Sequence, residues 1–266
     1  PRRRIRQMPA GPGRGALMLL CLFACRLASG AEAAPRVAII IDDLGYERVA
    51  GERAISLPGP VAYAVLPGAP RASELARMAH ARGKDVILHL PLQAASDTHG
   101  EPSSGLLLDM SRQQFRHAVA ERIDAVPHIV GVNTHRGSLL TRHPGHMRWL
   151  MDEIADRGNL FFVDSYTTAQ SVALRIANEQ GIEAARRDVF LDPDRHPDTV
   201  VREFARLKKI ASSRGFAIGI GHPYPATLDY LARALPALEA EGFELVGIRE
   251  LVAIASGSRP VATSAQ

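Results

Sequence analysis

The stretch VAIIIDDLG, residues 37–45, decides the fold class, because an aliphatic run ends there in two adjacent carboxylates, Asp42 and Asp43. A run with no polar alternation predicts a strand that is buried on both faces, as in parallel sheets covered by helices. Two neighbouring carboxylates repel each other, so the pair needs either open solvent or a positive group between its members. The stretch therefore predicts a buried parallel strand with a chemically active end.

The same pattern recurs along the chain, where short apolar runs alternate with longer amphipathic segments, as in repeated β-α units. The expected strands are 37–41, 61–66, 85–90, 129–133, 160–163, 188–191, 216–221 and 244–248. The expected helices are 71–82, 111–124, 146–157, 198–214 and 227–241. Seven to eight such units predict an α/β fold, a distorted or incomplete parallel β/α barrel, with an open doubly wound sheet as the alternative.

The first residues have the pattern of an export signal. A basic segment precedes the apolar run ALMLLCLFAC, residues 16–25, and small residues follow it. Ten apolar residues are too few to span a bilayer as a helix, and small residues suit signal peptidase. We therefore interpret 1–33 as a signal peptide, with an uncleaved anchor as the alternative, and expect export to the periplasm. Residues 34–255 then form one domain and 256–266 a flexible tail.

Without this leader the charge balance changes. The leader holds six arginines and one glutamate, so 26 of the 32 basic and 27 of the 28 acidic residues remain, a net charge of −1. A chain without a basic surplus lacks the main means of neutralising phosphates, which argues against a nucleic-acid partner. Both cysteines, Cys21 and Cys25, also lie in the leader. The remaining chain can form neither a disulfide nor a thiolate site.

Polar residues gather where the expected strands end, which is the edge at which β/α barrels carry their reactive groups. The residues in question are Asp42, Asp43, His89, Gln93, Asn133, His135, Ser138, Asp164, Ser165, Asp192, His222 and Tyr224. Each has an ordinary structural explanation when taken alone. Asp43 could cap the next helix, His89 could be a hydrogen-bonded core histidine, and Asp164 or Asp192 could bind backbone amides. Their accumulation at one edge favours a functional site.

The residue types at this edge favour a metal. Carboxylate oxygen and imidazole nitrogen are usual ligands of Zn²⁺ where thiolates are absent. A divalent cation would hold one carboxylate of the pair and leave its neighbour free. We therefore expect Asp43 to bind the metal and Asp42 to act as a base toward a water that the metal activates. A histidine across the pocket could protonate the leaving nitrogen.

The stretches IIIDDLG, ILHLPLQ, GVNTHRGSLLT, FFVDSYTT, DVFLD and IGIGHPYPAT resemble the divergent polysaccharide deacetylase family, distant relatives of NodB-type carbohydrate esterases, over about 36–252. The resemblance implies a distorted barrel and an exported, metal-dependent hydrolase of linear amide C–N bonds. It implies Asp42 and His222 as catalytic residues, and Asp43 and His89 as metal ligands. The second histidine ligand of the related esterases falls on Gln93, so we expect His135 to replace it.

Three functions are compatible with these residues. The first is deacetylation of an N-acetylated polysaccharide, with Asn133, Ser138, Asp164, Asp192 and Tyr224 as candidate substrate-binding residues. The second is a catalytically inactive barrel of the cell envelope that binds a glycan or a partner. The third is a glycosidase that uses two of three acids, Asp42, Asp164 and Asp192. Gln93 favours the second, whereas the carboxylate pair and three strand-end histidines favour the first, which we adopt.

Overall fold

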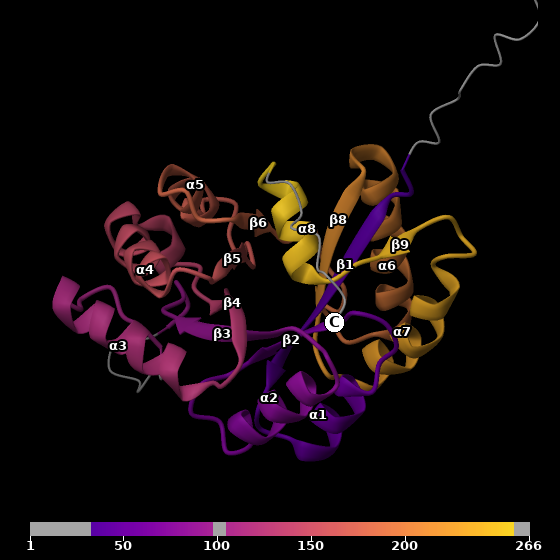
Figure 1. Ribbon diagram of the computed structural model, residues 1–266, viewed down its shortest axis with the longest axis horizontal. Coiled ribbons are helices and arrows are strands. Elements are labelled where there is room, and N and C mark those ends of the chain that lie inside the picture. The colour runs from indigo at the N-terminus through magenta and orange to yellow at the C-terminus, as the bar shows by residue number, and fades with distance from the viewer. Residues whose placement is uncertain (1–32, 98–104, 258–266) are drawn as a thin grey trace, which may run out of the picture. The chain divides into compact units, whose positions relative to one another are not determined.

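The structure, a computed structural model, describes residues 33–97 and 105–257 (Figure 1). The expected signal peptide, except its last residue, and the tail beyond residue 257 lie outside the described residues, so both assignments stay predictions. Residues from Ala34 onward belong to one compact unit, which contains every strand and helix of the described chain. In the described part of the chain, no helix is both long enough and apolar enough to cross a membrane.

Within these residues, nine strands form one sheet in which every pairing is parallel. The strands are β1 (Arg36–Leu44), β2 (Ala62–Val65), β3 (Val86–Leu92), β4 (Ile129–Arg136), β5 (Phe161–Asp164), β6 (Ala184–Arg186), β7 (Val189–Phe190), β8 (Phe216–Gly221) and β9 (Glu244–Leu245). Their order is β6-β5-β4-β3-β2-β1-β8-β7, with β9 paired to the start of β1. The order does not close on itself, so the predicted incomplete β/α barrel is confirmed.

The helices follow the strands in alternation. They are α1 (Arg48–Ile55), α2 (Ala72–Ala81), α3 (Arg112–Ala125), the 3₁₀ turn η1 (Leu140–Arg142), α4 (Pro144–Arg157), α5 (Ala173–Glu179), α6 (Pro197–Arg214), α7 (Pro225–Ala237) and α8 (Ile248–Ala255). Proline opens α4, α6 and α7, where its missing N–H costs nothing. Gly158 and Gly215 end α4 and α6 in the left-handed conformation, as helix-terminating glycines do.

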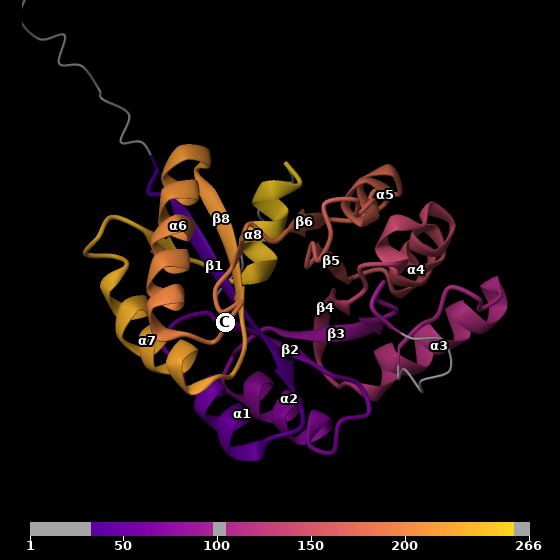
Figure 2. The ribbon, with the colours of Figure 1, turned by 180° about the vertical axis from the view of Figure 1, so that it is seen from behind.

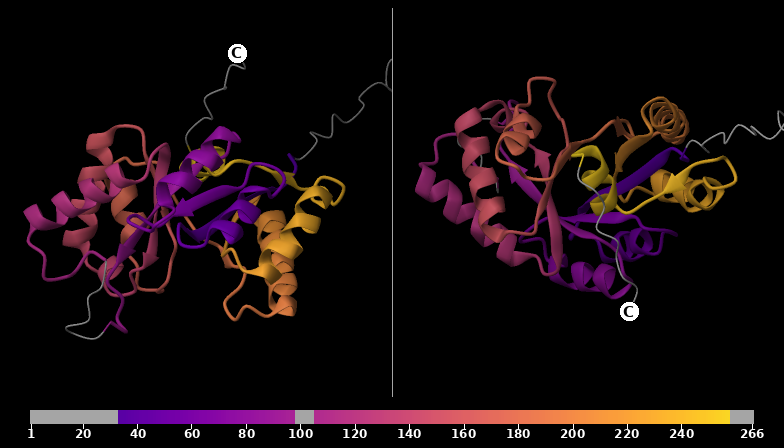
Figure 3. Two further views of the ribbon diagram at one scale, coloured as in Figure 1. Left: turned by 90° about the horizontal axis from the view of Figure 1, so that it is seen from below. Right: turned by 45° about the horizontal axis from the view of Figure 1, so that its top comes forward.

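The curled sheet separates two apolar layers. Along β1, Ile39 and Ile41 pack outward against the helices, whereas Ala38 and Ile40 pack inward. The inner layer is completed by α8, which contacts β1, β5, β6 and β8. Figures 1 and 2 show α8 inside the curve while α1 to α7 surround the sheet, and Figure 3 shows β1 beside β8. Covering both faces explains why the strands read as continuous apolar runs.

The chain departs from the sequence-based prediction after Leu245. The expected strand 244–248 is wrong beyond that residue, because Ile248 opens α8 and turns its apolar side into the barrel. A short apolar run does not by itself distinguish a strand from a buried helix. Strand β6 was not predicted, since its sequence AAR carries no strand preference and its existence depends on pairing with β5.

Ser256, the first residue of the expected tail, is attached to the barrel. Its hydroxyl oxygen accepts a hydrogen bond from the backbone N–H of Ala184 at 2.9 Å and donates one to the carbonyl of Ala184 at 3.1 Å. This pair of bonds ties the end of α8 to β6.

Candidate metal centre

Asp42 and Asp43 both face the mouth of the barrel, although neighbouring strand residues normally point to opposite faces. The side chain of Asp42 points inward, in the same alternation as those of Ala38 and Ile40. Asp43 has a φ of 60°, a left-handed conformation that is uncommon outside glycine. The β1–β2 register also shifts between Ile41 and Leu44, as at a β-bulge. The irregular backbone therefore turns a second carboxylate toward the mouth, as bulges beside functional sites do.

Three side-chain atoms from three strands converge at this point. Asp43 Oδ1 lies 3.2 Å from His89 Nε2 and 3.1 Å from His135 Nδ1, and the two ring nitrogens are 3.1 Å apart. These residues form the group in the described chain whose atoms could hold a metal ion. Asp43 Oδ1 is also buried without a well-formed hydrogen bond. The three atoms thus form a nearly equilateral triangle around a point that lies equally near to all of them.

This triangle fits a divalent cation. Ligand atoms of a tetrahedral Zn²⁺ site lie about 2.0–2.1 Å from the ion and therefore roughly 3.3 Å from one another. One carboxylate and two imidazoles are also a donor set that zinc and neighbouring first-row metals accept. Asp43, His89 and His135 are the residues that would hold such an ion, and the three sequence-predicted ligands do lie together.

The electrostatics of the triad favour a positive charge at its centre. Burial alone would raise the pKa of Asp43, but hydrogen bonding and charge from His135 and His89 lower it well below its usual range. Burial would lower the pKa of His89, yet Asp42 and Asp43 raise it. Asp43 is therefore ionised, as a metal ligand must be, and the two acids attract a cation to the imidazoles.

Asn133 connects the expected base to a metal ligand. Its amide nitrogen donates to Asp42 Oδ1 at 2.8 Å, and its amide oxygen lies 2.8 Å from His89 Nδ1. Because that oxygen can only accept, the proton of His89 sits on Nδ1 and the Nε2 lone pair is left for a ligand. Asn133 is fully buried and does not reach the cavity, so this positioning role replaces the sugar contact predicted for it.

Asp42 differs from its neighbour in both contacts and charge behaviour. Its Oδ2 lies 3.6 Å from His89 Nε2, farther than Asp43 Oδ1. Burial raises the pKa of Asp42, against the opposing influence of His89 and His222. The rise brings this carboxylate closer to the range in which it exchanges protons near neutral pH. The two acids thus differ, because Asp43 belongs to the triad and Asp42 lies beside it.

His222 approaches the same position from β8. Its Nε2 lies 3.6 Å from Asp43 Oδ2, and its Nδ1 is 2.9 Å from Asp192 Oδ1. The other oxygen of Asp192 accepts from the backbone N–H of His222 at 2.7 Å and from the hydroxyl of Thr227 at 2.6 Å. Burial would lower the pKa of His222, but Asp192 and Asp42 raise it. Asp192 is only 2% exposed and is positioned to orient this imidazole, and the sugar contact expected of it stays a prediction.

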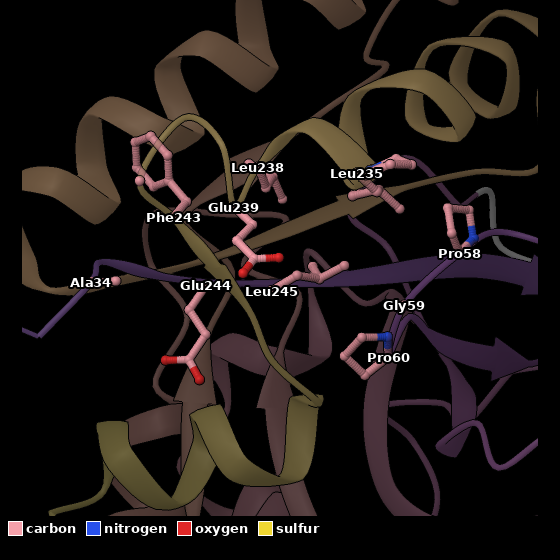
Figure 4. Close-up of a pocket in the computed structure, with 12 residues that line it drawn as sticks. Ala34, Pro58, Gly59, Pro60, Leu235, Leu238, Glu239, Phe243, Glu244 and Leu245 are labelled. Carbon is pink, nitrogen blue, oxygen red and sulfur yellow. The ribbon is translucent and has the colours of Figure 1, made fainter.

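A cavity of about 330 Å³ lies beside the triad. Its lining residues are Asp42, His89, Thr134, His135, Arg136, Ser165, Thr167, Arg187, Phe190, Ile220 and His222. A larger hollow of about 520 Å³ lies near the start of β1 (Figure 4). Its walls are mostly proline and leucine, with Glu239 and Glu244, and it holds no histidine. The smaller cavity is the one that includes residues of the triad, together with Asp42, His222 and two arginines.

The remaining candidate residues occupy the surroundings of the site. Asp164 accepts from the N–H of Tyr166 at 2.8 Å and from the hydroxyl of Ser171 at 2.7 Å, which holds a loop, and it is buried away from the cavity. Ser138 accepts from the N–H of Ala95 at 3.0 Å, so it too positions a loop. The ring of Tyr224 stacks on His222 with centroids 5.2 Å apart. A sugar contact by Tyr224 stays a prediction.

Gln93 is not part of the metal centre. Its side-chain oxygen accepts from the backbone N–H of Leu108 at 2.8 Å, and its carbonyl accepts from Leu139 and Leu140. The side chain holds the returning end of the loop that follows β3. His135, from β4, supplies the second imidazole of the triad.

Sequence reasoning missed Arg187 and Phe190 in the cavity wall, and it gave Ser165 a place at a strand end but no role. Arg187 follows β6, a strand without a recognisable sequence signal, so its position at a strand end was hidden. Ser165 and Phe190 were visible at the ends of expected strands, but neither residue type indicates chemistry by itself.

The chain is thus an incomplete parallel β/α barrel that brings Asp43, His89 and His135 together at the carboxyl edge of its strands. The sequence matches the divergent polysaccharide deacetylase family over residues 39–252, and the chain belongs to that family.

Similar proteins agree with this membership. The chain is 35% identical to the uncharacterized protein YibQ of Escherichia coli (strain K12) over 79% of this chain and 65% of YibQ. It is 36% identical to an uncharacterized protein of Haemophilus influenzae over 81% of this chain and 76% of that protein. The crystal structure of the uncharacterized protein ATU2773 of Agrobacterium tumefaciens superposes with a TM-score of 0.78 at 23% identity, covering 83% of this chain and 90% of that one. The chain thus spans about two thirds of YibQ and shares its fold with ATU2773.

Proposed function

We propose that this protein is a metal-dependent hydrolase that removes acetyl groups from the amino sugars of a polysaccharide by cleaving the linear amide C–N bond. The observation that carries the proposal is the triangle of Asp43, His89 and His135, with edges of 3.1–3.2 Å, beside a separately held carboxylate, Asp42. Zinc is the metal that best suits this donor set.

The residues around the triangle divide the work of hydrolysis. A divalent cation bound there supplies Lewis acidity that polarises the acetamide carbonyl and acidifies water. Asp42, held by Asn133, accepts the proton of the attacking water. His222 donates a proton to the amine nitrogen as the C–N bond breaks. Phe190 and Ile220 form an apolar part of the cavity wall, which suits the methyl of the acetyl group.

The two alternatives, a glycosidase and a barrel that only binds a glycan or a partner, have less support from the contacts of their key residues. A glycosidase needs two available carboxyl groups, but both oxygens of Asp164 and of Asp192 are taken by chain partners. A binding-only barrel was favoured by Gln93 at an expected ligand position. His135 supplies an imidazole there instead, so the donor set does not depend on Gln93.

The proposal is tested by acetate release. Purified protein carrying zinc is expected to liberate acetate from an N-acetylated glycan, such as a chitin oligosaccharide or peptidoglycan, and to stop after treatment with a chelator. Return of zinc should restore release, as followed by enzymatic assay of acetate. Glycan binding that is indifferent to the chelator, with no acetate formed, would replace the proposal with the binding-only function.

Replacing Asp192 with asparagine is expected to lower kcat for acetate release by about 10- to 100-fold, the usual effect of removing an orienting partner. Asp192 Oδ2 accepts two hydrogen bonds, so the asparagine oxygen is expected there and its NH2 group faces His222 Nδ1. The ring then loses its orienting acceptor and the contribution of Asp192 to its raised pKa. KM should change little, since Asp192 does not line the cavity. Asp198→Asn, at a side chain that is 88% exposed, serves as the control and should behave as the unmodified protein.

We also propose that the protein is exported to the periplasm. The basic start, the apolar run at 16–25 and the cysteine-free remainder support this location. N-terminal sequencing of protein from the periplasmic fraction tests it. Cleavage near residue 33 is the expected result, and recovery of uncleaved protein from the cytoplasm would contradict export.

A further inference from the structure

Arg187 places a cation in the wall of the catalytic cavity. Arg187 lies two residues after Ala185, whose side chain packs inside the barrel. Alternation along the strand therefore directs the Arg187 side chain to the same side. The guanidinium donates from Nε to the carbonyl of Ser165 at 2.6 Å and from Nη2 to the carbonyl of Tyr166 at 3.0 Å. These two bonds hold the guanidinium in one orientation and leave Nη1 without a hydrogen bond from the described residues.

This cation has no acid of its own. Among the described residues, no carboxylate lies within ion-pair distance of Arg187, whereas Arg136 at the same cavity is paired with Asp97. Burial lowers the pKa of Arg187, and the charge of Asp42 is the main influence that opposes the shift. A half-buried arginine with free donors and no paired acid is suited to bind an anion from outside the chain.

The charge balance of the cavity leads to the same conclusion, and this step rests on the proposed function. Asp42 and Asp43 lie within ion-pair distance of the imidazoles of the site, not of Arg187. Arg187 therefore leaves one positive charge in the cavity wall without a paired acid among the described residues. A substrate with one negative charge near Arg187 would remove this excess, because charges in a poorly solvated site interact strongly.

Ser165 provides a second donor beside Arg187. The residue follows the inward phase of Phe161 and Val163, lines the cavity and is only 5% exposed. Its hydroxyl is buried and has no hydrogen-bond partner in the described chain. An unpaired buried hydroxyl is costly, and such groups call for a ligand or a water. The unbonded Nη1 of Arg187 and the unpaired hydroxyl of Ser165 belong to neighbouring strand ends.

We infer that Arg187 and Ser165 form a subsite for an anionic substituent, a carboxylate or a phosphate, on the amino sugar that is deacetylated. The cavity of about 330 Å³ can hold one sugar ring with such a substituent. The substrate class of the hydrolase is therefore an acidic N-acetylated glycan.

The test compares three sugars on the zinc-loaded protein. N-Acetylmuramic acid carries a carboxylate, N-acetylglucosamine 6-phosphate carries a phosphate, and N-acetylglucosamine carries neither. At least one acidic sugar is expected to bind on the order of tenfold more tightly than N-acetylglucosamine, as measured by ligand-observed NMR titration. Preference for one acid over the other identifies the anion. Equal affinity for all three sugars would overturn the inference.

Two variants locate the preference. Arg187→Gln should reduce the ratio of affinities to about one, whereas Arg186→Gln, at the exposed neighbouring arginine, should leave it unchanged. Ser165→Ala should weaken binding of the acidic sugar severalfold without lowering the melting temperature, because the removed hydroxyl has no chain partner. This second variant keeps the test decisive if Arg187→Gln fails to fold. A preference that survives in Ser165→Ala and in a folded Arg187→Gln protein would refute the subsite.

Acetate measured in the same tubes separates this inference from the proposed function. Release from N-acetylglucosamine and from the acidic sugars at equal rates and affinities would retain the deacetylase and reject the subsite. Preferential binding of the acidic sugar without acetate release would retain the subsite and reject the hydrolase.

Discussion

Asp42→Asn is expected to lower kcat for acetate release about 10³-fold, within the range of about 10²–10⁴ that a general base contributes. Asparagine keeps the shape of the side chain, and its oxygen can still accept the hydrogen bond from Asn133, now 2.8 Å long. What is lost is the ability to take a proton from water. Zinc affinity should remain within a few-fold of the unmodified value, because Asp42 lies outside the triad.

The two measurements together identify the role of Asp42. Metal content after dialysis, by elemental analysis, separates a lost base from a lost ligand, and KM should remain close to that of the unmodified protein. A variant with kcat within threefold of the unmodified protein would remove Asp42 from the mechanism. A variant that loses zinc as well as activity would make Asp42 a ligand and reverse the division between the two neighbouring acids.

His135→Ala is expected to weaken zinc binding on the order of 10²- to 10³-fold. Structural zinc sites bind with about 10–16 kcal/mol shared among their ligands, so one ligand contributes roughly 3–4 kcal/mol. Competition with a chromophoric chelator measures this affinity directly. Acetate release should fall in parallel and return in part at high zinc concentration, since Asp43 and His89 remain in place.

Two control variants make the role of His135 specific. Gln93→Ala should leave zinc affinity within a few-fold, because the Gln93 oxygen is engaged by the backbone of Leu108. Gln93→Ala is expected instead to weaken the attachment of Leu108 to the end of β3. His117→Ala removes an imidazole that is 74% exposed on α3 and should change neither property. If Gln93→Ala lost zinc while His135→Ala kept it, the assignment of the third ligand would be wrong.

The fold was largely visible in the sequence because buried parallel strands and amphipathic helices have distinct periodicities. The predicted helix over 198–214 agrees with α6, and the predicted strand over 216–221 agrees with β8. The elements that the sequence did not assign are short, namely strand β6 and helices α1, α5 and α8. Strand β6 and helix α8 exist because their neighbours cover them, and a three-residue strand has too few side chains to produce a pattern.

The candidate site was visible only in part, for a related reason. Asp43, His89 and His135 were recognisable because their residue types suit a metal and each follows an expected strand. Asn133, Asp164 and Asp192 were assigned to sugar from the same position at strand ends. In the structure their polar atoms are taken by other segments of the chain. Burial and hydrogen-bond partners depend on segments distant in sequence, so residue type and position could not separate these groups from those that face the cavity.

Residue type and periodicity are local properties, and they were enough to specify the parallel barrel and the supply of acids and imidazoles at one edge. The role of each group came from the assembled sheet. A positive φ and a register shift turned Asp43 beside Asp42, and pairing of β3 with β4 brought His135 to His89 while Gln93 was engaged elsewhere. Side-chain direction depends on backbone geometry and strand register, which are set only when the strands are assembled.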